Sequence, residues 1–147
     1  MPPTAPITYR SSRPEDIPFI AQIIEPYVAD RKLMPRGHDE LSNLIPNGFV
    51  AEADGQVVGF AAVEIYSKKL AEVLCLGVDG AYQGYGIGKR LVAMCVERAR
   101  EFEVRELMAI SSSEGFFRGC GFDFILPDER KVFFIRTGPS TEDEATE

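Results

Sequence analysis

The sequence predicts a mixed α/β (α+β) domain in which about seven strands and four helices follow one another in the order β-α-α-β-β-β-α-β-α-β-β. Its 147 residues are enough for one domain with its own hydrophobic core. Apolar side chains recur at helical spacing in residues 17–28 and 91–102. Two runs of β-type residues flank Asp54-Gly55, a dipeptide that favours a tight hairpin. Together these patterns indicate a layered fold of strands and helices.

The N-terminal part is predicted to contain a strand, a helix and a loop-rich segment. The strand covers residues 7–11, and the helix begins after Ser12, which together with Glu15 resembles a capping box. Residues 29–46 are polar and interrupted by prolines and a glycine, so we expect a loop there with one short helix at residues 39–44.

The middle of the chain is predicted to form most of the sheet. Strands are expected at residues 49–53, 56–66 and 71–78, and the last of these is apolar enough for a central position. A glycine-rich stretch then leads into an amphipathic helix that ends near residue 102. A further strand is expected at residues 106–111.

The C-terminal part is predicted to add one helix and two strands. The helix is expected at residues 113–118 and the strands at residues 122–125 and 132–136. Residues 138–147 contain no large apolar side chain and carry four acids. We therefore expect one domain at residues 1–137 and a disordered acidic tail at residues 138–147.

Composition excludes several classes of protein. The net charge of −7 argues against nucleic acid or an anionic membrane as the main partner. No apolar run approaches the roughly 20 residues that span a bilayer, and the N-terminus lacks the features of a signal sequence. Cys75, Cys95 and Cys120 form no CxxC pair, and His38 is the single histidine. We expect reduced thiols, a cytoplasmic location and no metal site.

The segment with the clearest chemistry is the glycine-rich stretch between the strand at residues 71–78 and the next helix. Glycines at 84, 86 and 88 let the backbone approach a ligand closely, and the free N–H groups of a helix start favour an anion. A Walker loop would need Gly at 83 and Ser or Thr at 90, but these are Gln83 and Arg90. A dinucleotide fingerprint starting at Gly84 would need Gly at 89, which is Lys89. Neither nucleotide motif fits.

Gln83, Gly86 and Gly88 instead match the Q/R-x-x-G-x-G/A signature, and the chain resembles the GNAT N-acetyltransferases over residues 7–136. The resemblance implies a mixed, mostly antiparallel sheet of about six to seven strands flanked by about four helices. It also implies that the glycine loop wraps the pyrophosphate of acetyl-CoA. The strand at residues 75–78 would splay from its neighbour and bind the pantetheine arm through free main-chain groups.

A closer resemblance is to the acetyltransferase domain of N-acetylglutamate synthases. It rests on the phrases PYVADRKLMPRGHDEL, AEVLCLGV and SSSEGFFRGCGF, and on the LPDER turn. The amino-acid kinase domain of the long synthases is not in this sequence. The resemblance implies an acetyl-CoA-dependent enzyme that acts on a small amine or amino acid, glutamate first, and it leaves a homodimer open.

Functional residues follow from these resemblances. Acetyl-CoA binding is expected at residues of the strand, the loop and the last helix: Cys75, Leu76, Val78, Gln83, Gly84, Tyr85, Gly86, Ile87, Gly88, Lys89 and Phe117. Glu72, on the strand beside the thioester, is the expected general base. Many GNAT enzymes protonate the leaving thiolate with a tyrosine where this chain has Phe116-Phe117. Ser111 is the expected donor here, with Ser112 and Ser113 as rivals and with Tyr66, Tyr82 and Tyr85 as fallback donors.

Positive side chains are the candidates for binding the acceptor. Arg36 in the loop-rich segment and Arg136 on the last predicted strand lie in regions that flank the acceptor site in GNAT folds, and an arginine fork matches a carboxylate. Lys68 and Lys69, just before the central strand, could add a second cationic contact. Two alternatives stay open. One is a protein Lys or N-terminal acetyltransferase, and the other is a CoA-binding regulatory module without catalysis.

Overall fold

The computed structural model describes residues 6–124, 133 and 135–138. Its strands are β1 (Thr8–Ser11), β2 (Gly48–Ala53), β3 (Gln56–Ile65), β4 (Leu70–Val78) and β5 (Glu106–Met108). Its α-helices are α1 (Ile17–Ala29), α2 (His38–Leu44), α3 (Ile87–Glu101) and α4 (Glu114–Gly119). Three short 3-10 helices are η1 (Pro14–Asp16), η2 (Ile45–Asn47) and η3 (Gly80–Tyr82).

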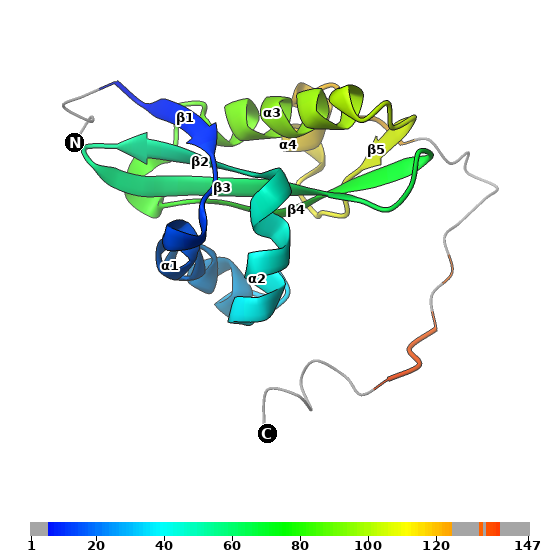
Figure 1. Cartoon of the computed structure of the whole chain (residues 1–147), viewed down its shortest axis with the longest axis horizontal. Coiled ribbons are helices and arrows are strands. Elements are labelled where there is room, and N and C mark those ends of the chain that lie inside the picture. Colours follow the sequence, from blue (N-terminus) through cyan, green and yellow to red (C-terminus); the bar gives the residue numbers. More distant parts are fainter. Residues whose placement is uncertain (1–5, 125–132, 134, 139–147) are drawn as a thin grey trace.

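The strands form one sheet in the order β1-β2-β3-β4-β5 (Figure 1). The three pairings among β1, β2, β3 and β4 are antiparallel, and β5 pairs with β4 in parallel. The β2–β3 hairpin turns at Asp54 (φ 51°) and Gly55 (φ 77°), the left-handed pair expected of this dipeptide. This arrangement confirms the predicted α+β class with a mixed, mostly antiparallel sheet.

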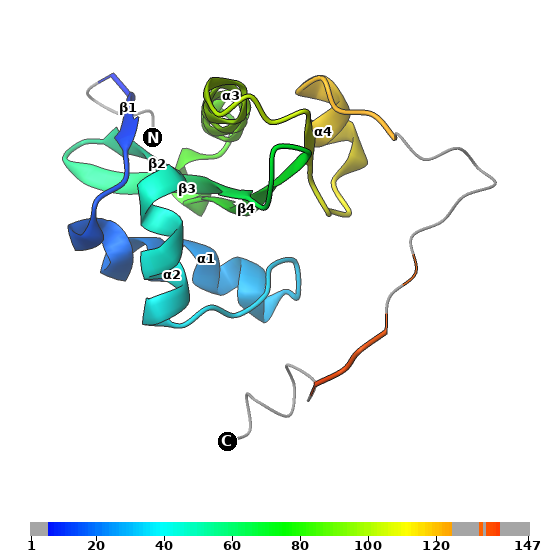
Figure 2. The same ribbon diagram turned by 45° about the vertical axis from the view of Figure 1, so that its right-hand side comes forward.

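Helices cover both faces of the sheet. In both ribbon views α1 and α2 lie on one side and α3 on the other (Figures 1 and 2). Alternate residues of β2 serve the two layers: Val50 packs with the α1 and α2 side chains, whereas Phe49 and Ala51 pack with those of α3. The sheet therefore separates two hydrophobic cores.

β4 contains a bulge where it crosses the middle of the sheet. Phe60 pairs with Gly77 and Ala62 with Leu74, so β4 has one residue more than β3 over this stretch. Cys75 lies in the bulge with φ 57°, a left-handed conformation that residues with side chains rarely adopt. The bulge changes the direction of β4 just before the glycine loop.

Two close contacts join β3 to α3 and β1 to η1. Gly59 of β3 lies beneath the start of α3, where a Cβ atom would be 2.8 Å from Ile87 Cγ2 and 3.1 Å from Leu91 Cδ1. At the other end of the sheet, both terminal nitrogens of Arg10 donate to the carboxylate of Asp16 at 2.8 Å, and Arg10 Nε donates to Glu52. Asp16 is 5% exposed, whereas the Arg10 and Glu52 side chains are 24% and 34% exposed, so the Asp16 end of this ion-pair network is the part removed from water.

Some local predictions were wrong. The Ser12 hydroxyl does not cap a helix but donates to the Ile45 carbonyl, and it is the Asp16 carboxylate that accepts from the backbone N–H of Arg13. The strand predicted at residues 106–111 ends at Met108 because β4 no longer runs alongside it.

The two C-terminal strands are described only in part. Residues 122–124, 133, 135 and 136 are not in a strand, and residues 125, 132 and 134 lie outside the described residues. Of the predicted acidic tail, Gly138 alone is described, so the proposed boundary at residue 137 stays a prediction.

Candidate active site

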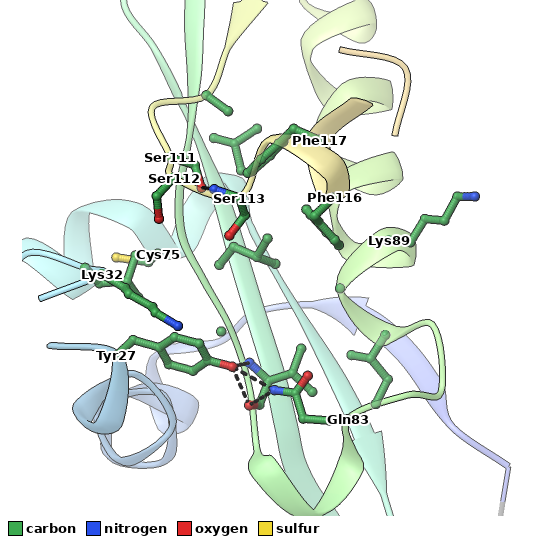
Figure 3. A pocket seen from close by; sticks show the side chains of 18 of the residues that line it. Tyr27, Lys32, Cys75, Gln83, Lys89, Ser111, Ser112, Ser113, Phe116 and Phe117 are labelled. Atoms are coloured by element: carbon green, nitrogen blue, oxygen red, sulfur yellow. Dashed lines mark hydrogen bonds between the residues drawn. The ribbon is translucent and has the colours of Figure 1, made fainter. Parts of the chain in front are cut away.

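A cavity opens where β4 and β5 separate. Their pairing covers three positions, from Leu70–Glu106 to Glu72–Met108, and then the two segments diverge. A cavity of about 420 Å³ fills the gap, with the second half of β4 on one side and residues 109–113 on the other (Figure 3). The splayed sheet implied by the sequence resemblance is therefore present.

The glycine loop forms one end of the cavity. Gly84 (φ 86°) and Gly86 (φ 76°) are both left-handed, and a Cβ at either residue would meet no heavy atom within 4 Å. Their lack of side chains therefore serves backbone conformation and ligand approach, not internal packing. α3 starts at the next residue, Ile87, so the free N–H groups of its first turn lie beside the cavity.

The groups around this end suit a polyanion. Lys89 and Lys32 both line the cavity, one from α3 and one from the loop after α1. Backbone N–H groups, the positive end of the α3 dipole and two ammonium groups together favour phosphate oxygens. A pantetheine chain can extend from there along the open edge of β4. The residues present thus fit acetyl-CoA, whose thioester would supply the acetyl group when bound.

Tyr27 is a cavity residue that sequence reasoning missed. Its hydroxyl donates to the Val78 carbonyl oxygen at 2.8 Å and accepts from the Val78 N–H at 3.2 Å. It also accepts from Gln83 Nε2 at 2.9 Å (Figure 3). The main-chain groups of Val78, expected to be free for the pantetheine arm, are therefore bonded within the protein.

A cluster of polar groups lies around the β4 bulge, on the side of α2. We call Arg36, Tyr66, Glu72 and Cys75 the Arg36 cluster. Arg36 Nη1 is 3.6 Å from Glu40 Oε2, and the Arg36 side chain is only 20% exposed. The Tyr66 hydroxyl donates to Glu72 Oε1 at 2.7 Å. Cys75 is the member of the cluster that lines the cavity.

Electrostatic effects connect the members of this cluster. Burial raises the pKa of the Cys75 thiol, while the charge of Arg36 and a hydrogen bond from it act in the opposite direction. Burial and the hydrogen bond to Glu72 raise the pKa of Tyr66 to about 12, and the charge of Arg36 again opposes the shift. Arg36 is thus close to both Tyr66 and Cys75, so its positive charge reaches the cavity wall at the bulge.

Three serines form the opposite wall of the cavity. Ser111, Ser112 and Ser113 all line it, together with Phe116 and Phe117 of α4. Ser111 Oγ accepts a hydrogen bond from the Ser113 N–H at 2.9 Å. Because this bond uses a lone pair, the hydroxyl proton of Ser111 remains available to a group in the cavity.

The structure brings most of the predicted cofactor residues together and leaves four other predicted site residues outside. All of the predicted cofactor residues except Tyr85 line the cavity. Glu72 and Arg36 lie beside it, in the Arg36 cluster. Lys68 is at the β3–β4 turn, where its Nζ donates to the Phe102 carbonyl at 3.2 Å. Arg136 is exposed and is not in a strand.

Sequence reasoning missed several other lining residues. Lys32 and Leu33 reach the cavity from the loop after α1. Tyr82, named above as a fallback donor, lines the cavity from η3. Lys32 and Leu33 lie in the PYVADRKLMPRGHDEL phrase that carries the resemblance to the synthases, but only the placement of α1 against β4 shows that they reach the cavity. Within the described part of the chain, His, Cys, Asp and Glu side chains form no group of three suited to a metal ion. None of the helices described is both long and apolar enough to cross a membrane.

The splayed mixed sheet and the glycine loop at the start of α3 are the features expected of a CoA-dependent acyltransferase. Residues 17–122 match the Acetyltransferase (GNAT) family. The chain belongs to this family and is an acetyl-CoA-dependent N-acetyltransferase.

Named relatives support the same class. An uncharacterized N-acetyltransferase of Chlorobaculum tepidum is 32% identical over 120 residues, which are 82% of this chain and 77% of the relative. An amino-acid acetyltransferase of Neisseria meningitidis is 32% identical over 125 residues, covering 84% of this chain. The alignment spans only 29% of that longer relative.

Solved structures show the same fold with CoA bound. A Mycobacterium tuberculosis protein in complex with CoA has a TM-score of 0.76 and 27% identity, with 85% of this chain and 76% of that one covered. N-acetylglutamate synthase from Neisseria gonorrhoeae, complexed with coenzyme A and N-acetyl-glutamate, has a TM-score of 0.71 and 31% identity. The match covers 78% of this chain and 27% of the synthase.

Proposed function

We propose that the chain transfers the acetyl group of acetyl-CoA to the α-amine of a small acidic amino acid, glutamate first. The observation that carries this proposal is the position of Arg36, whose side chain is only 20% exposed and lies beside the cavity, close enough for its charge to act on Cys75 in the cavity lining. A partly desolvated guanidinium fork is suited to a carboxylate. The names of the amino-acid acetyltransferase and N-acetylglutamate synthase relatives support the same acceptor class.

The cofactor would be held by the chain's own loop and strand. The N–H groups of the Gln83–Gly88 loop and of the first turn of α3 would bind the pyrophosphate, and Lys89 and Lys32 would balance its charge. The β4 bulge and the serine wall would flank the thioester. The carboxylates of the acceptor would then face Arg36, with the amine directed to the bulge.

Two side chains would move protons. Glu72 would accept a proton from the acceptor ammonium, directly or through water, with its carboxylate held by the Tyr66 hydroxyl. Ser111 would donate its hydroxyl proton to the leaving thiolate, since its oxygen already accepts from Ser113. Arg136 and Lys68 remain predicted acceptor contacts, without a position beside the cavity in the described structure.

An acceptor screen with matched variants tests the proposal. Wild-type protein is assayed with acetyl-CoA and free amino acids, polyamines or a lysine-containing peptide, and glutamate is expected to be the preferred acceptor. Arg36→Ala should lower kcat/KM for glutamate about ten- to a hundredfold, since a charge-assisted contact contributes about 1.5–3 kcal/mol. The control is Arg105→Ala, an exposed arginine away from the cavity.

Each other result would assign a different function. Preference for the peptide, with Arg36→Ala unaffected, would indicate a protein acetyltransferase. CoA binding without turnover of any acceptor would indicate a regulatory module. Glutamine in place of glutamate should lose a similar factor if Arg36 binds the side-chain carboxylate, and no loss would mean that it binds the α-carboxylate.

A further inference from the structure

The hydroxyl of Tyr27 joins three parts of the structure at the cavity floor. Tyr27 belongs to the last turns of α1, Val78 ends β4, and Gln83 begins the glycine loop. All three residues line the cavity. Since 51 residues separate Tyr27 from Val78, this contact is a long-range connection and not a feature of local folding.

The geometry uses the full bonding capacity of the hydroxyl. Its proton goes to the Val78 carbonyl oxygen, and its two lone pairs accept from the Val78 N–H and from Gln83 Nε2. Gln83 Nε2 also donates to the Val78 carbonyl oxygen at 3.1 Å. The side chain of Gln83 is therefore folded back onto the end of β4 and is not extended into the cavity.

The strand is shaped to allow this contact. A Cβ at Gly77 would lie 3.4 Å from Tyr27 Cε2 and 3.3 Å from Ile23 Cγ2, closer than most such contacts. Because Gly77 has no side chain, the Tyr27 ring can lie against β4, and its hydroxyl then lies beside the main chain of Val78. The edge of β4 has lost β5 as a partner here, so a side chain from α1 takes over the bonds of Val78.

We propose that Tyr27 is a positioning residue for the cofactor loop: its hydroxyl fixes Gln83 to the end of β4 and so sets the direction in which the loop N–H groups point. This inference rests on the proposed acetyl-CoA site. Gln83 then acts through its fold-back bonds, and not by touching the pyrophosphate with its amide. The effect of Tyr27 should appear in cofactor affinity and not in the chemical step.

The test is a double-mutant cycle measured by calorimetry with CoA. Tyr27→Phe keeps the ring and removes the hydroxyl, and Gln83→Met keeps the length of the side chain and removes its donors. Gln83→Met should weaken CoA binding about tenfold because it removes both fold-back bonds, and Tyr27→Phe should weaken it by no more than that because the bond from Gln83 to the Val78 carbonyl remains. The double variant should be no more than slightly weaker than Gln83→Met, because Tyr27 acts on the loop through Gln83. In steady-state assays Tyr27→Phe should raise KM for acetyl-CoA and leave kcat unchanged.

A matched control is Tyr9→Phe, the same change in β1, outside the cavity lining. It should bind CoA as the wild type does. If the wild type binds no CoA, the proposed function and this inference fail together. If the wild type binds and Tyr27→Phe binds equally well, the inference alone is overturned. Independent effects that multiply to a hundredfold, or a loss in kcat at constant KM, would also overturn it.

Amide exchange in the wild type tests the same bond without a variant, should Tyr27→Phe fold poorly. The Val78 N–H should exchange slowly in the absence of CoA because the tyrosine hydroxyl covers it. Exchange as fast as at an open strand edge would refute the role of Tyr27.

Discussion

Replacing Gly59 by alanine should move the start of α3 and, with it, the cofactor loop. The new Cβ would lie 2.8 Å from Ile87 Cγ2 and 3.1 Å from Leu91 Cδ1, and both side chains are buried at 2% and 0% exposure. Carbon atoms pack at about 3.5–4.0 Å, so the helix must shift or repack by about 0.5–1 Å. Ile87 is the first residue of α3, and its displacement moves the N–H groups that face the cavity.

Two opposing effects decide the change in unfolding free energy. The backbone of Gly59 is not left-handed, so alanine should gain about 0.4–1 kcal/mol by restricting the unfolded chain. Overpacking a close-fitting core typically costs about 1–3 kcal/mol. The net prediction is a loss of about 1–2 kcal/mol, with CoA affinity several-fold weaker.

Urea unfolding followed by circular dichroism measures the change in unfolding free energy, and calorimetry with CoA measures the change in CoA affinity. Gly115→Ala is the control, because its Cβ would meet nothing within 4 Å and the residue lies in α4. That variant should be about 0.5–1 kcal/mol more stable than the wild type, as expected for alanine in a helix. A Gly59→Ala protein as stable as the control would show that β3 and α3 are not close-packed against each other at this position.

Three further changes test the site and the fold. Gly86→Asp should weaken CoA binding about a hundredfold, because it adds a negative charge and a side chain in the left-handed region, while circular dichroism should still show a folded protein. Glu72→Gln should lower kcat about a hundredfold without changing KM for acetyl-CoA and should remove the acidic limb of the pH–rate profile; wild-type turnover would assign proton removal to water. Asp16→Asn should cost about 2–3 kcal/mol in urea unfolding at pH 7. Hydrogen bonds from Arg10 lower the pKa of Asp16, so this contribution is present in full above the ordinary pKa of a carboxyl group and is lost as the pH falls from about 4 through the lowered pKa; the gap between the two proteins should narrow steadily below about pH 4, and a gap independent of pH would contradict the ion-pair argument.

Features that depend on local backbone geometry could be predicted from the sequence. The Asp54-Gly55 turn and the glycines of the loop were recognisable because left-handed backbone restricts which residues can occupy a position. The amphipathic pattern of α3 was equally clear, since one face must be apolar to cover the sheet.

Features that depend on contacts between distant segments could not be predicted. In the sequence, Tyr27 occupies one of the apolar positions of a predicted helix, and no neighbouring residue indicates that its hydroxyl bonds to Val78. The end of β5 was missed for the same reason, because residues 109–111 continue a strand-like pattern after the neighbouring strand has departed. The sequence shows that a segment prefers an extended conformation, but it does not show whether a neighbouring strand lies beside that segment to pair with it.

The gap between β4 and β5 makes the sheet incomplete in the free protein. A ligand that occupies the gap supplies contacts that a neighbouring strand would otherwise make, and it binds only the folded chain. By mass action a ligand at a hundred times its Kd adds about 2.7 kcal/mol to the free energy of unfolding. The amount of folded enzyme in a cell would then follow the supply of acetyl-CoA, so that turnover of the protein by proteases is slowest when its own cosubstrate is abundant.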